Sequence, residues 1–337
     1  MITRIALISC PSYNPRTMAK STRRGEAGFR TELLNWYDAN RRDLPWRRTG
    51  DPYRIWVSEI MLQQTRVAAV LDHYERFFRR FPTVINLASA REQTVLAAWS
   101  GLGYYRRARN LHACAKKVAQ AGGFPKSSEE LRLLPGIGRY TAAAIASIAF
   151  GEKCAAVDGN VERVLSRMAG RKLESAETWQ RAGELMAADR PGDFNQAMME
   201  LGALVCLPGG PKCTHCPVRG FCAAKGDLGL SRKEQREVKQ LSLALARRDG
   251  KVWLVQRDQN ASLMPGMWEL PQLNANGDRA LGTFRHAILN ADYRVTVYES
   301  GEAIGQGKWV SETALDRVAL TGLSRKVMLH VRAKGNL

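Results

Sequence analysis

Residues 134–145 read LPGIGRYTAAAI, and this stretch indicates more about the fold than any other segment of the chain. Gly136 and Gly138 permit positive φ angles that turn backbone N–H groups outward. The apolar run after Tyr140 predicts a helix, whose N-terminal dipole favours a phosphate. Ser127 and Glu130 have capping-box spacing and predict a helix before the turn. We therefore expect a helix-hairpin-helix in which both glycines contact a nucleic-acid backbone, although a purely structural turn would use similar residues.

Asp158 lies twenty residues after Gly138, within the segment VDGNVERV of residues 157–164. Asp158 and Asn160 precede an apolar-periodic segment, so helix capping is their ordinary role. A carboxylate at this distance from the hairpin is also placed to reach a bound nucleotide. The residues alone leave both roles open.

The rest of the chain divides by the period of its apolar residues. From Phe29 to Ala223 they recur at three and four positions, which predicts an all-α domain over 26–223. Residues 1–25 are polar and basic and are predicted as a disordered leader, and 224–240 as a linker. Beyond the linker, Asp249-Gly250 lies between two alternating segments and predicts a type I′ hairpin. With strand-like residues 293–299 and a closing helix at 323–334, residues 241–337 are predicted as a small α+β domain.

Four cysteines form the pattern C-x6-C-x2-C-x5-C over residues 206–222. Thiolates select zinc or iron–sulfur centres, and zinc sites usually separate two ligand pairs by a dozen or more residues. The compact spacing favours a 4Fe-4S cluster, one cysteine for each iron corner. Zinc, with His215 as a further ligand, and a disulfide pair are the alternatives. The predicted ligands are Cys206, Cys213, Cys216 and Cys222.

The chain of 337 residues carries a formal net charge of +19, which favours a polyanionic partner such as nucleic acid. It contains no run of eighteen apolar residues, so neither a transmembrane helix nor membrane contact is expected. The N-terminus has no signal-peptide pattern, and a thiolate cluster needs a reducing compartment. We expect a cytoplasmic monomer associated with the bacterial nucleoid.

The hairpin, Asp158 and the cysteine loop, in this order and spacing, resemble the endonuclease III superfamily of helix-hairpin-helix DNA glycosylases. Within it, the chain resembles the MutY-type adenine DNA glycosylases over residues 29–222. The resemblance implies excision of adenine mispaired with 8-oxoguanine, and more weakly with G, in double-stranded DNA. It is carried by LPWR at 44–47, WVSEIMLQQT at 56–65, GLGYY at 101–105 and FNQAMM at 194–199.

Glu59 lies on an apolar helical face, where a carboxyl group keeps its proton more readily than in water. The resemblance makes it the general acid that protonates adenine, and makes Asp158 the carboxylate that stabilises the sugar cation. Tyr140 and Asn160 complete this site by resemblance. Tyr140 also stands where bifunctional relatives carry a nucleophilic lysine, so base excision without strand cleavage is expected.

DNA recognition is assigned by the same resemblance, because the target base must leave the stack. Each of these residues alone would more often be core or surface. The residues implied to wedge into the duplex and touch the opposite base are Gln64, Thr65, Leu102 and Tyr104. Those implied to surround the adenine are Trp46, Arg47 and Gln196.

The C-terminal domain resembles the MutT-like domain of these enzymes but has no acidic Nudix metal box, so hydrolysis of nucleoside triphosphates is not expected. Where that domain often reads 8-oxoguanine with Phe-Ser-His, this chain has Ile288, Leu289 and Asn290. Two interpretations follow: Asn290 replaces one hydrogen bond to the lesion, or discrimination between 8-oxoguanine and G is weaker. Two alternatives remain: a thymine glycosylase for G·T mismatches, and a noncatalytic iron–sulfur DNA-binding protein.

Overall fold

The computed structural model describes residues 15–229, 237–274, 277, 279–288 and 291–333. The chain forms two compact units, one of residues 1–42 with 151–231 and one of residues 43–150 with 232–337. The predicted all-α domain therefore contributes to both units, since the chain leaves the first unit at residue 43 and returns at residue 151. No strand occurs in the described residues up to 229.

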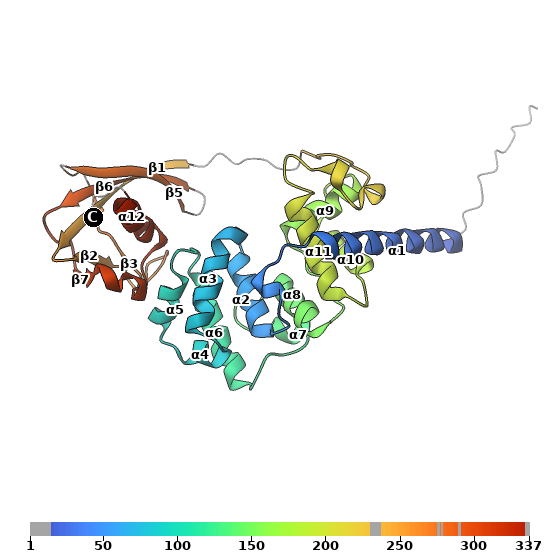
Figure 1. The fold of residues 1–337 in the computed structure, drawn as a ribbon, viewed down its shortest axis with the longest axis horizontal. Helices are drawn as coiled ribbons and strands as arrows, with labels where there is room; N and C mark the ends of the chain where they lie inside the picture. The colour runs from blue at the N-terminus through green and yellow to red at the C-terminus, as the bar shows by residue number, and fades with distance from the viewer. Residues whose placement is uncertain (1–14, 230–236, 275–276, 278, 289–290, 334–337) are drawn as a thin grey trace, which may run out of the picture. The chain divides into compact units, whose positions relative to one another are not determined.

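The first unit is built on one apolar core that α1 shares with α9 and α11 (Figure 1). Phe29 of α1 makes edge contacts with Phe194 at 6.3 Å and with Phe221 at 5.8 Å between ring centroids. These contacts join the N-terminal helix to the cysteine loop. The elements are α1 (Pro15–Asn40), α9 (Gly159–Ala169), α10 (Ser175–Leu185), α11 (Pro191–Leu204) and the 3-10 turns η2 (Cys213–His215) and η3 (Arg219–Phe221).

Helix α1 corrects one boundary, because it begins at Pro15, whereas the sequence predicted a disordered leader through residue 25. The prediction relied on the lack of an apolar period in this stretch. No proline interrupts the chain between Pro15 and Pro45, and the helix anchored by buried Phe29 and Tyr37 propagates backward at little cost. Residues 1–14 of the predicted leader lie outside the described residues.

The helices of the second unit begin with ordinary caps. Asp51 accepts a hydrogen bond from the Tyr53 N–H at 2.9 Å, with Pro52 in the first turn of α2. The helical elements are η1 (Pro45–Arg47), α2 (Pro52–Leu62), α3 (Val67–Arg80), α4 (Val84–Ser89), α5 (Glu92–Trp99), α6 (Arg106–Gln120), α7 (Ser128–Leu131) and α8 (Arg139–Phe150).

The predicted hairpin lies between α7 and α8, and its two glycines differ. Gly136 has φ +75°, and a Cβ there would lie 2.6 Å from the Asn110 Cβ, so both conformation and space require glycine. Gly138 does not adopt positive φ, which corrects the prediction for this residue. Its carbonyl already accepts the Ala142 N–H at 2.9 Å, because the backbone has entered the helix. A Cβ on Gly138 would meet open space.

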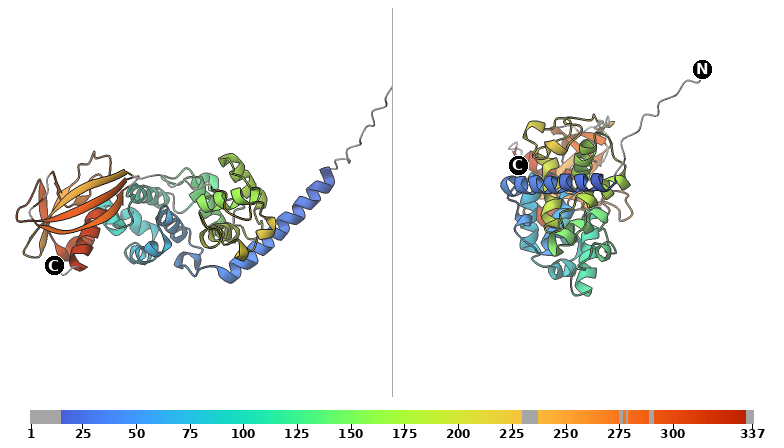
Figure 2. Two further views of the ribbon diagram at one scale, coloured as in Figure 1. Left: turned by 90° about the horizontal axis from the view of Figure 1, so that it is seen from above. Right: turned by 90° about the vertical axis from the view of Figure 1, so that its right-hand side faces the viewer.

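The C-terminal part of the second unit is a mixed seven-stranded sheet with strand order β3-β2-β1-β6-β5, and β4 and β7 pair with β1 and β2. Its strands curve around α12 (Figure 2). The strands are β1 (Glu237–Arg248), β2 (Lys251–Gln256), β3 (Trp268–Glu269), β4 (Gln272–Leu273), β5 (Ala280–Ile288), β6 (Ala291–Ser300) and β7 (Gly307–Ser311). They are followed by η4 (Glu312–Arg317) and α12 (Gly322–Ala333).

The predicted β-hairpin is confirmed, with Asp249 at φ +52°, Gly250 at φ +67° and Arg248 opposite Lys251. The strand at 293–299 and the closing helix are also present, as β6 and α12. β1 begins at Glu237, inside the range predicted as a linker, because parallel pairing with β6 extends it. Its polar residues there had no apolar period to indicate a strand.

Within the second unit the sheet region contacts the helices directly. The Ser100 hydroxyl donates to the Leu320 carbonyl at 2.6 Å, and the Tyr105 hydroxyl donates to the same oxygen at 3.2 Å. Arg109 Nη2 donates to the Pro265 carbonyl at 2.6 Å. These bonds tie the C-terminal region to the segment that follows α5.

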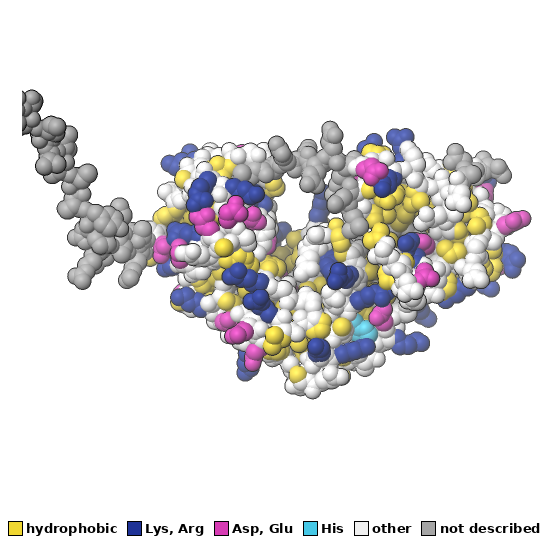
Figure 3. Space-filling model, turned by 180° about the vertical axis from the view of Figure 1, so that it is seen from behind, with side chains coloured by type: hydrophobic (Ala, Val, Ile, Leu, Met, Phe, Trp, Pro, Cys, Tyr) yellow, Lys and Arg dark blue, Asp and Glu magenta, His cyan; other side chains and the backbone are white. Residues whose placement is uncertain are grey.

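The surface agrees with the high positive charge. Lys and Arg side chains are spread over the face in Figure 3, with fewer acidic side chains among them. The basic residues therefore belong to folded surfaces and are not confined to one tail. In the part of the chain that the structure describes, no helix has the length and apolar character needed to span a membrane.

Candidate active site and cysteine pocket

The structure brings together Glu59 and Tyr140, two residues that the resemblance implied for one site. Glu59 projects from α2 and is 7% exposed, and Tyr140 is the second residue of α8, which packs against α2. The Tyr140 hydroxyl donates to Glu59 Oε2 at 2.6 Å. A phenol is a neutral donor, so this contact orients the carboxyl group without adding a positive charge beside it.

Asp158 is the N-cap of α9 in the first unit, which confirms the capping role that the sequence left open. Its Oδ1 accepts the N–H groups of Asn160 at 3.0 Å and Val161 at 2.9 Å. Its Oδ2 accepts from Asn160 Nδ2 at 2.7 Å. Three N–H donors therefore surround the carboxylate, and two of them belong to Asn160.

Two residues that hold Asn160 were missed by sequence reasoning. Arg163 Nη2 donates to Asn160 Oδ1 at 2.8 Å and to the Gly202 carbonyl at 2.8 Å. A Cβ on Gly202 would lie 2.5 Å from the Asn160 Cβ, so only glycine lets α11 approach so closely. Arg163 lies one turn after Asn160 on α9. That spacing was a usable signal, whereas the Gly202 contact depends on helix packing.

The four residues predicted to probe the duplex lie on two loops of the second unit. Gln64 and Thr65 follow α2, and Leu102 and Tyr104 lie between α5 and α6. Gln64 has φ +55° and Tyr104 φ +48°, a conformation uncommon outside glycine. Tyr104 is 44% exposed, whereas Leu102 is buried. Two of the four therefore have unusual backbone conformations in solvent-exposed loops.

The residues predicted around the adenine are divided between the units. Trp46 in η1 is buried and packs edge-on against Tyr74, with ring centroids 5.3 Å apart, and the neighbouring Arg47 is half-buried. Gln196 is half-buried on α11 in the first unit. Asn290 lies outside the described residues. The contacts of these residues with adenine stay predictions.

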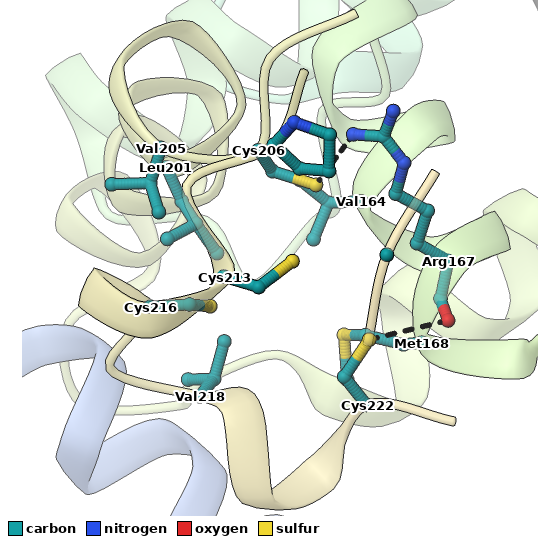
Figure 4. A pocket seen from close by; sticks show the side chains of 12 residues that line it. Val164, Arg167, Met168, Leu201, Val205, Cys206, Cys213, Cys216, Val218 and Cys222 are labelled. Carbon is teal, nitrogen blue, oxygen red and sulfur yellow. Dashed lines mark hydrogen bonds between the residues drawn. The ribbon is translucent and has the colours of Figure 1, made fainter. Parts of the chain in front are cut away.

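The four predicted ligand cysteines line a single pocket between α9, the end of α11 and the cysteine loop (Figure 4). The cavity volume is about 30 Å³. All four are free thiols in the structure. Burial and, to a lesser extent, the neighbouring cysteines raise the pKa of Cys216 to about 11. The four cysteines of the pocket are Cys206, Cys213, Cys216 and Cys222.

The four thiol groups of this pocket are donors that both predicted centres accept. No group of three or more His, Cys, Asp or Glu side chains in the described residues is arranged to hold one metal ion. Arg167 Nη1 donates to Cys206 Sγ at 3.2 Å, a cation suited to a thiolate-rich centre. The donor chemistry of the pocket therefore suits a thiolate-ligated centre, and the choice of a 4Fe-4S cluster stays a prediction.

Comparisons with known proteins define the class. Residues 57–187 match the family described as "HhH-GPD superfamily base excision DNA repair protein". A solved thermostable thymine-DNA glycosylase is 31% identical, with a TM-score of 0.57, and the match covers 61% of this chain and 98% of that chain. Endonuclease III in a complex with DNA shares the fold, at 21% identity and TM-score 0.52, over 64% of this chain and 97% of that one. The chain belongs to the HhH-GPD superfamily of base excision DNA repair proteins.

Within this superfamily, the chain is similar to adenine DNA glycosylases. It is 49% identical to that of Rattus norvegicus over 221 residues, covering 60% of this chain and 43% of the rat protein. It is 38% identical to that of Arabidopsis thaliana over 317 residues, covering 77% of this chain and 50% of the plant protein. The chain thus spans half or less of the length of these two relatives.

Proposed function

We propose that this chain is an adenine DNA glycosylase that removes adenine paired with 8-oxoguanine and, more weakly, with G. The observation that carries the proposal is the buried Glu59 carboxyl group held by the Tyr140 hydroxyl at 2.6 Å. The similarity to adenine DNA glycosylases of animals and plants supports the choice of base. Double-stranded DNA is then the substrate that the charge of +19 attracts.

In the proposed reaction, the Glu59 carboxylic acid donates its proton to N7 of the flipped adenine. The C1′–N9 bond then breaks, and its electron pair leaves with the neutral base. The sugar is left as an oxocarbenium ion, which the Asp158 carboxylate stabilises. Water adds to C1′, and the Glu59 carboxylate takes up the proton that this water loses.

Tyr140 makes the proposed activity monofunctional. A strand-cleaving relative needs an amine that attacks C1′ and forms a Schiff base. Here the corresponding side chain is a phenol that donates to Glu59. Borohydride should therefore trap very little covalent protein–DNA adduct, and efficient trapping would contradict this part of the proposal.

The cysteine pocket is proposed to hold a 4Fe-4S cluster through its four cysteines. When bound, the cluster joins the end of α11 to the loop of residues 206–222 and so orders the basic segment from Lys212 to Arg219 for DNA phosphates. Iron and acid-labile sulfide should be present in equal amounts in protein purified without oxygen. Zinc in their place would refute the assignment. Cys213→Ser should lower stability and DNA affinity before it affects the chemical step.

DNA recognition is proposed at four places. Gly136 and Gly138 in the hairpin bind a phosphate, aided by the N-terminus of α8. The loops carrying Gln64, Thr65, Leu102 and Tyr104 enter the duplex. Trp46, Arg47 and Gln196 surround the extruded adenine. The C-terminal sheet region is proposed to be a MutT-like domain that reads the opposite base through Asn290.

Single-turnover excision from A·8-oxoguanine, A·G and G·T duplexes tests the proposal. We expect the fastest rate on A·8-oxoguanine. Equal rates on the two adenine substrates would show that the C-terminal region does not recognise 8-oxoguanine. Faster thymine release from G·T would show that thymine, not adenine, is the base removed; a thymine-DNA glycosylase is among the similar solved structures, at 31% identity.

A further inference from the structure

Arg107, in the first turn of α6, is a half-buried guanidinium group without an acidic partner. No ion pair of Arg107 is present among the residues that the structure describes. Burial lowers its pKa to about 10, so it stays charged at neutral pH. A buried cation of this kind is stable only when polar groups replace its lost hydration.

Those polar groups come from two loops and from one helix end. Nη1 donates to the carbonyls of Ile60 at 2.7 Å, Met61 at 3.1 Å and Gln63 at 2.5 Å. Ile60 and Met61 belong to the last turn of α2, whose carbonyl groups have no partner within the helix and form the negative end of its dipole. Arg107 thus caps the helix that carries Glu59.

The other terminal nitrogen joins the second loop to the first. Nη2 donates to Thr65 Oγ1 at 3.3 Å and to the carbonyls of Leu102 at 3.1 Å and Gly103 at 3.3 Å. The guanidinium group also lies 5.3 Å from the centroid of the Tyr104 ring. One side chain therefore contacts both loops that bear residues with positive φ, Gln64 and Tyr104.

We propose that Arg107 is a positioning residue that holds the loop of residues 63–65 and the loop of residues 101–104 in one arrangement relative to α2. Non-glycine residues at positive φ persist only where their surroundings fix them, and the guanidinium group binds the carbonyls beside both. The role in base extrusion rests on the proposed glycosylase function. Arg107 pre-organises the two loops that are proposed to enter the duplex, so its loss should lower the rate of the chemical step more than the affinity for DNA.

Arg107→Lys tests this proposal because lysine keeps the charge but has one nitrogen, which cannot reach both sets of acceptors. In the free protein, hydrogen exchange of amides in 62–66 and 100–105 should become roughly tenfold faster, with α8 unchanged. The single-turnover rate on A·8-oxoguanine DNA at saturating protein should fall about tenfold or more. Affinity for undamaged duplex should stay within about twofold.

Arg106→Lys is the matched control, since Arg106 is the exposed neighbour on the same turn of α6. It should leave both the exchange and the excision rate within about twofold of the unmodified chain. If folded Arg107→Lys protein showed unchanged exchange in both loops, the positioning role would be overturned. If the unmodified chain released no adenine, the proposed function would fail while the exchange result still decided the role of Arg107.

A second variant covers the case in which Arg107→Lys does not fold. Thr65→Val removes one acceptor of Arg107 and keeps the shape of the side chain. Because Thr65 lies in the first loop, faster exchange in the second loop, at 101–104, would show that the guanidinium group couples them. Exchange that changed only around residue 65 would overturn the proposal.

Discussion

Glu59 and Asp158 carry the same chemical group in opposite environments. Glu59 is 7% exposed and receives a hydrogen bond from a neutral phenol on one oxygen. Asp158 is half-buried at a helix N-terminus, and N–H donors approach both of its oxygens. A hydroxyl group donates to one oxygen of Glu59, whereas backbone and side-chain N–H groups donate to both oxygens of Asp158. The two carboxyl groups are thus held by different kinds of donor, which is consistent with the separate roles proposed for them in glycosidic cleavage.

Glu59→Gln should have the largest effect on the excision rate, because it changes the first of these two carboxyl groups. Gln keeps the size of Glu and can still accept from the Tyr140 hydroxyl, but it has no acidic proton to donate. We expect the single-turnover excision rate to fall about a thousandfold. Affinity for A·8-oxoguanine DNA, measured by fluorescence anisotropy, should change less than about threefold. An excision rate near normal would exclude Glu59 as the acid.

Asp158→Asn should have the second-largest effect. Asn is a good N-cap, so α9 should persist. The free energy of unfolding should fall by about 1 kcal/mol, because Asn160 Nδ2 now donates to a carboxylate and would then face another amide group. The negative charge that is proposed to stabilise the sugar cation is lost, and we expect the excision rate to fall about a hundredfold. Chemical denaturation separates the two effects. A rate loss fully explained by unfolded protein would show that Asp158 acts only as a cap.

Much of this arrangement was predictable from sequence, because it depends on local patterns. The helical period, the Asp249-Gly250 turn and the Asp158 cap are short-range features, and each is present in the structure. The Glu59–Tyr140 contact is long-range, and it came from resemblance rather than from spacing. Arg107 was missed because its partners are carbonyl groups, which every residue has. Its position in the first turn of α6 gave no signal of what lay opposite.

The boundaries that failed have a related cause. Residues 15–25 and 237–240 have no apolar period of their own, and each extends an element that is fixed elsewhere. Gly138 was assigned positive φ because glycine permits it, yet the residue before a helix does not require it. Composition shows which conformations are allowed, whereas packing selects one of them.

Tyr140→Phe tests the comparison by removing the hydroxyl group that donates to Glu59 Oε2. The buried carboxyl group then loses this hydrogen bond, so we expect a loss of roughly tenfold in the excision rate. The same variant should leave the Asp158 region unaffected, and hydrogen exchange of α9 should be unchanged. A loss as large as that of Glu59→Gln would mean that Tyr140 takes a direct part in the reaction. Combining Tyr140→Phe with Glu59→Gln should add little beyond the second change, since both act on one pair.

The smallest expected effect concerns the pH dependence of folding stability, which adds to any pH dependence of the excision rate. Burial lowers the pKa of His73, whose ring lies between the carbonyls of Ala69 and Ser100 and near Arg76 and Arg325. The unfolded chain, with a value near 6.5, therefore binds more protons than the folded protein below that pH. Stability should be full above pH 6.5 and fall as the pH drops through 6 toward the lower folded value.

His73→Gln should remove this contribution, because glutamine does not titrate and still donates a hydrogen bond. We expect the rise in melting temperature between pH 5 and pH 7 to be about 1–2 °C smaller than in the unmodified chain. Calorimetry across this range is the measurement. A steeper pH dependence in the variant would show that His73 is protonated in the folded state.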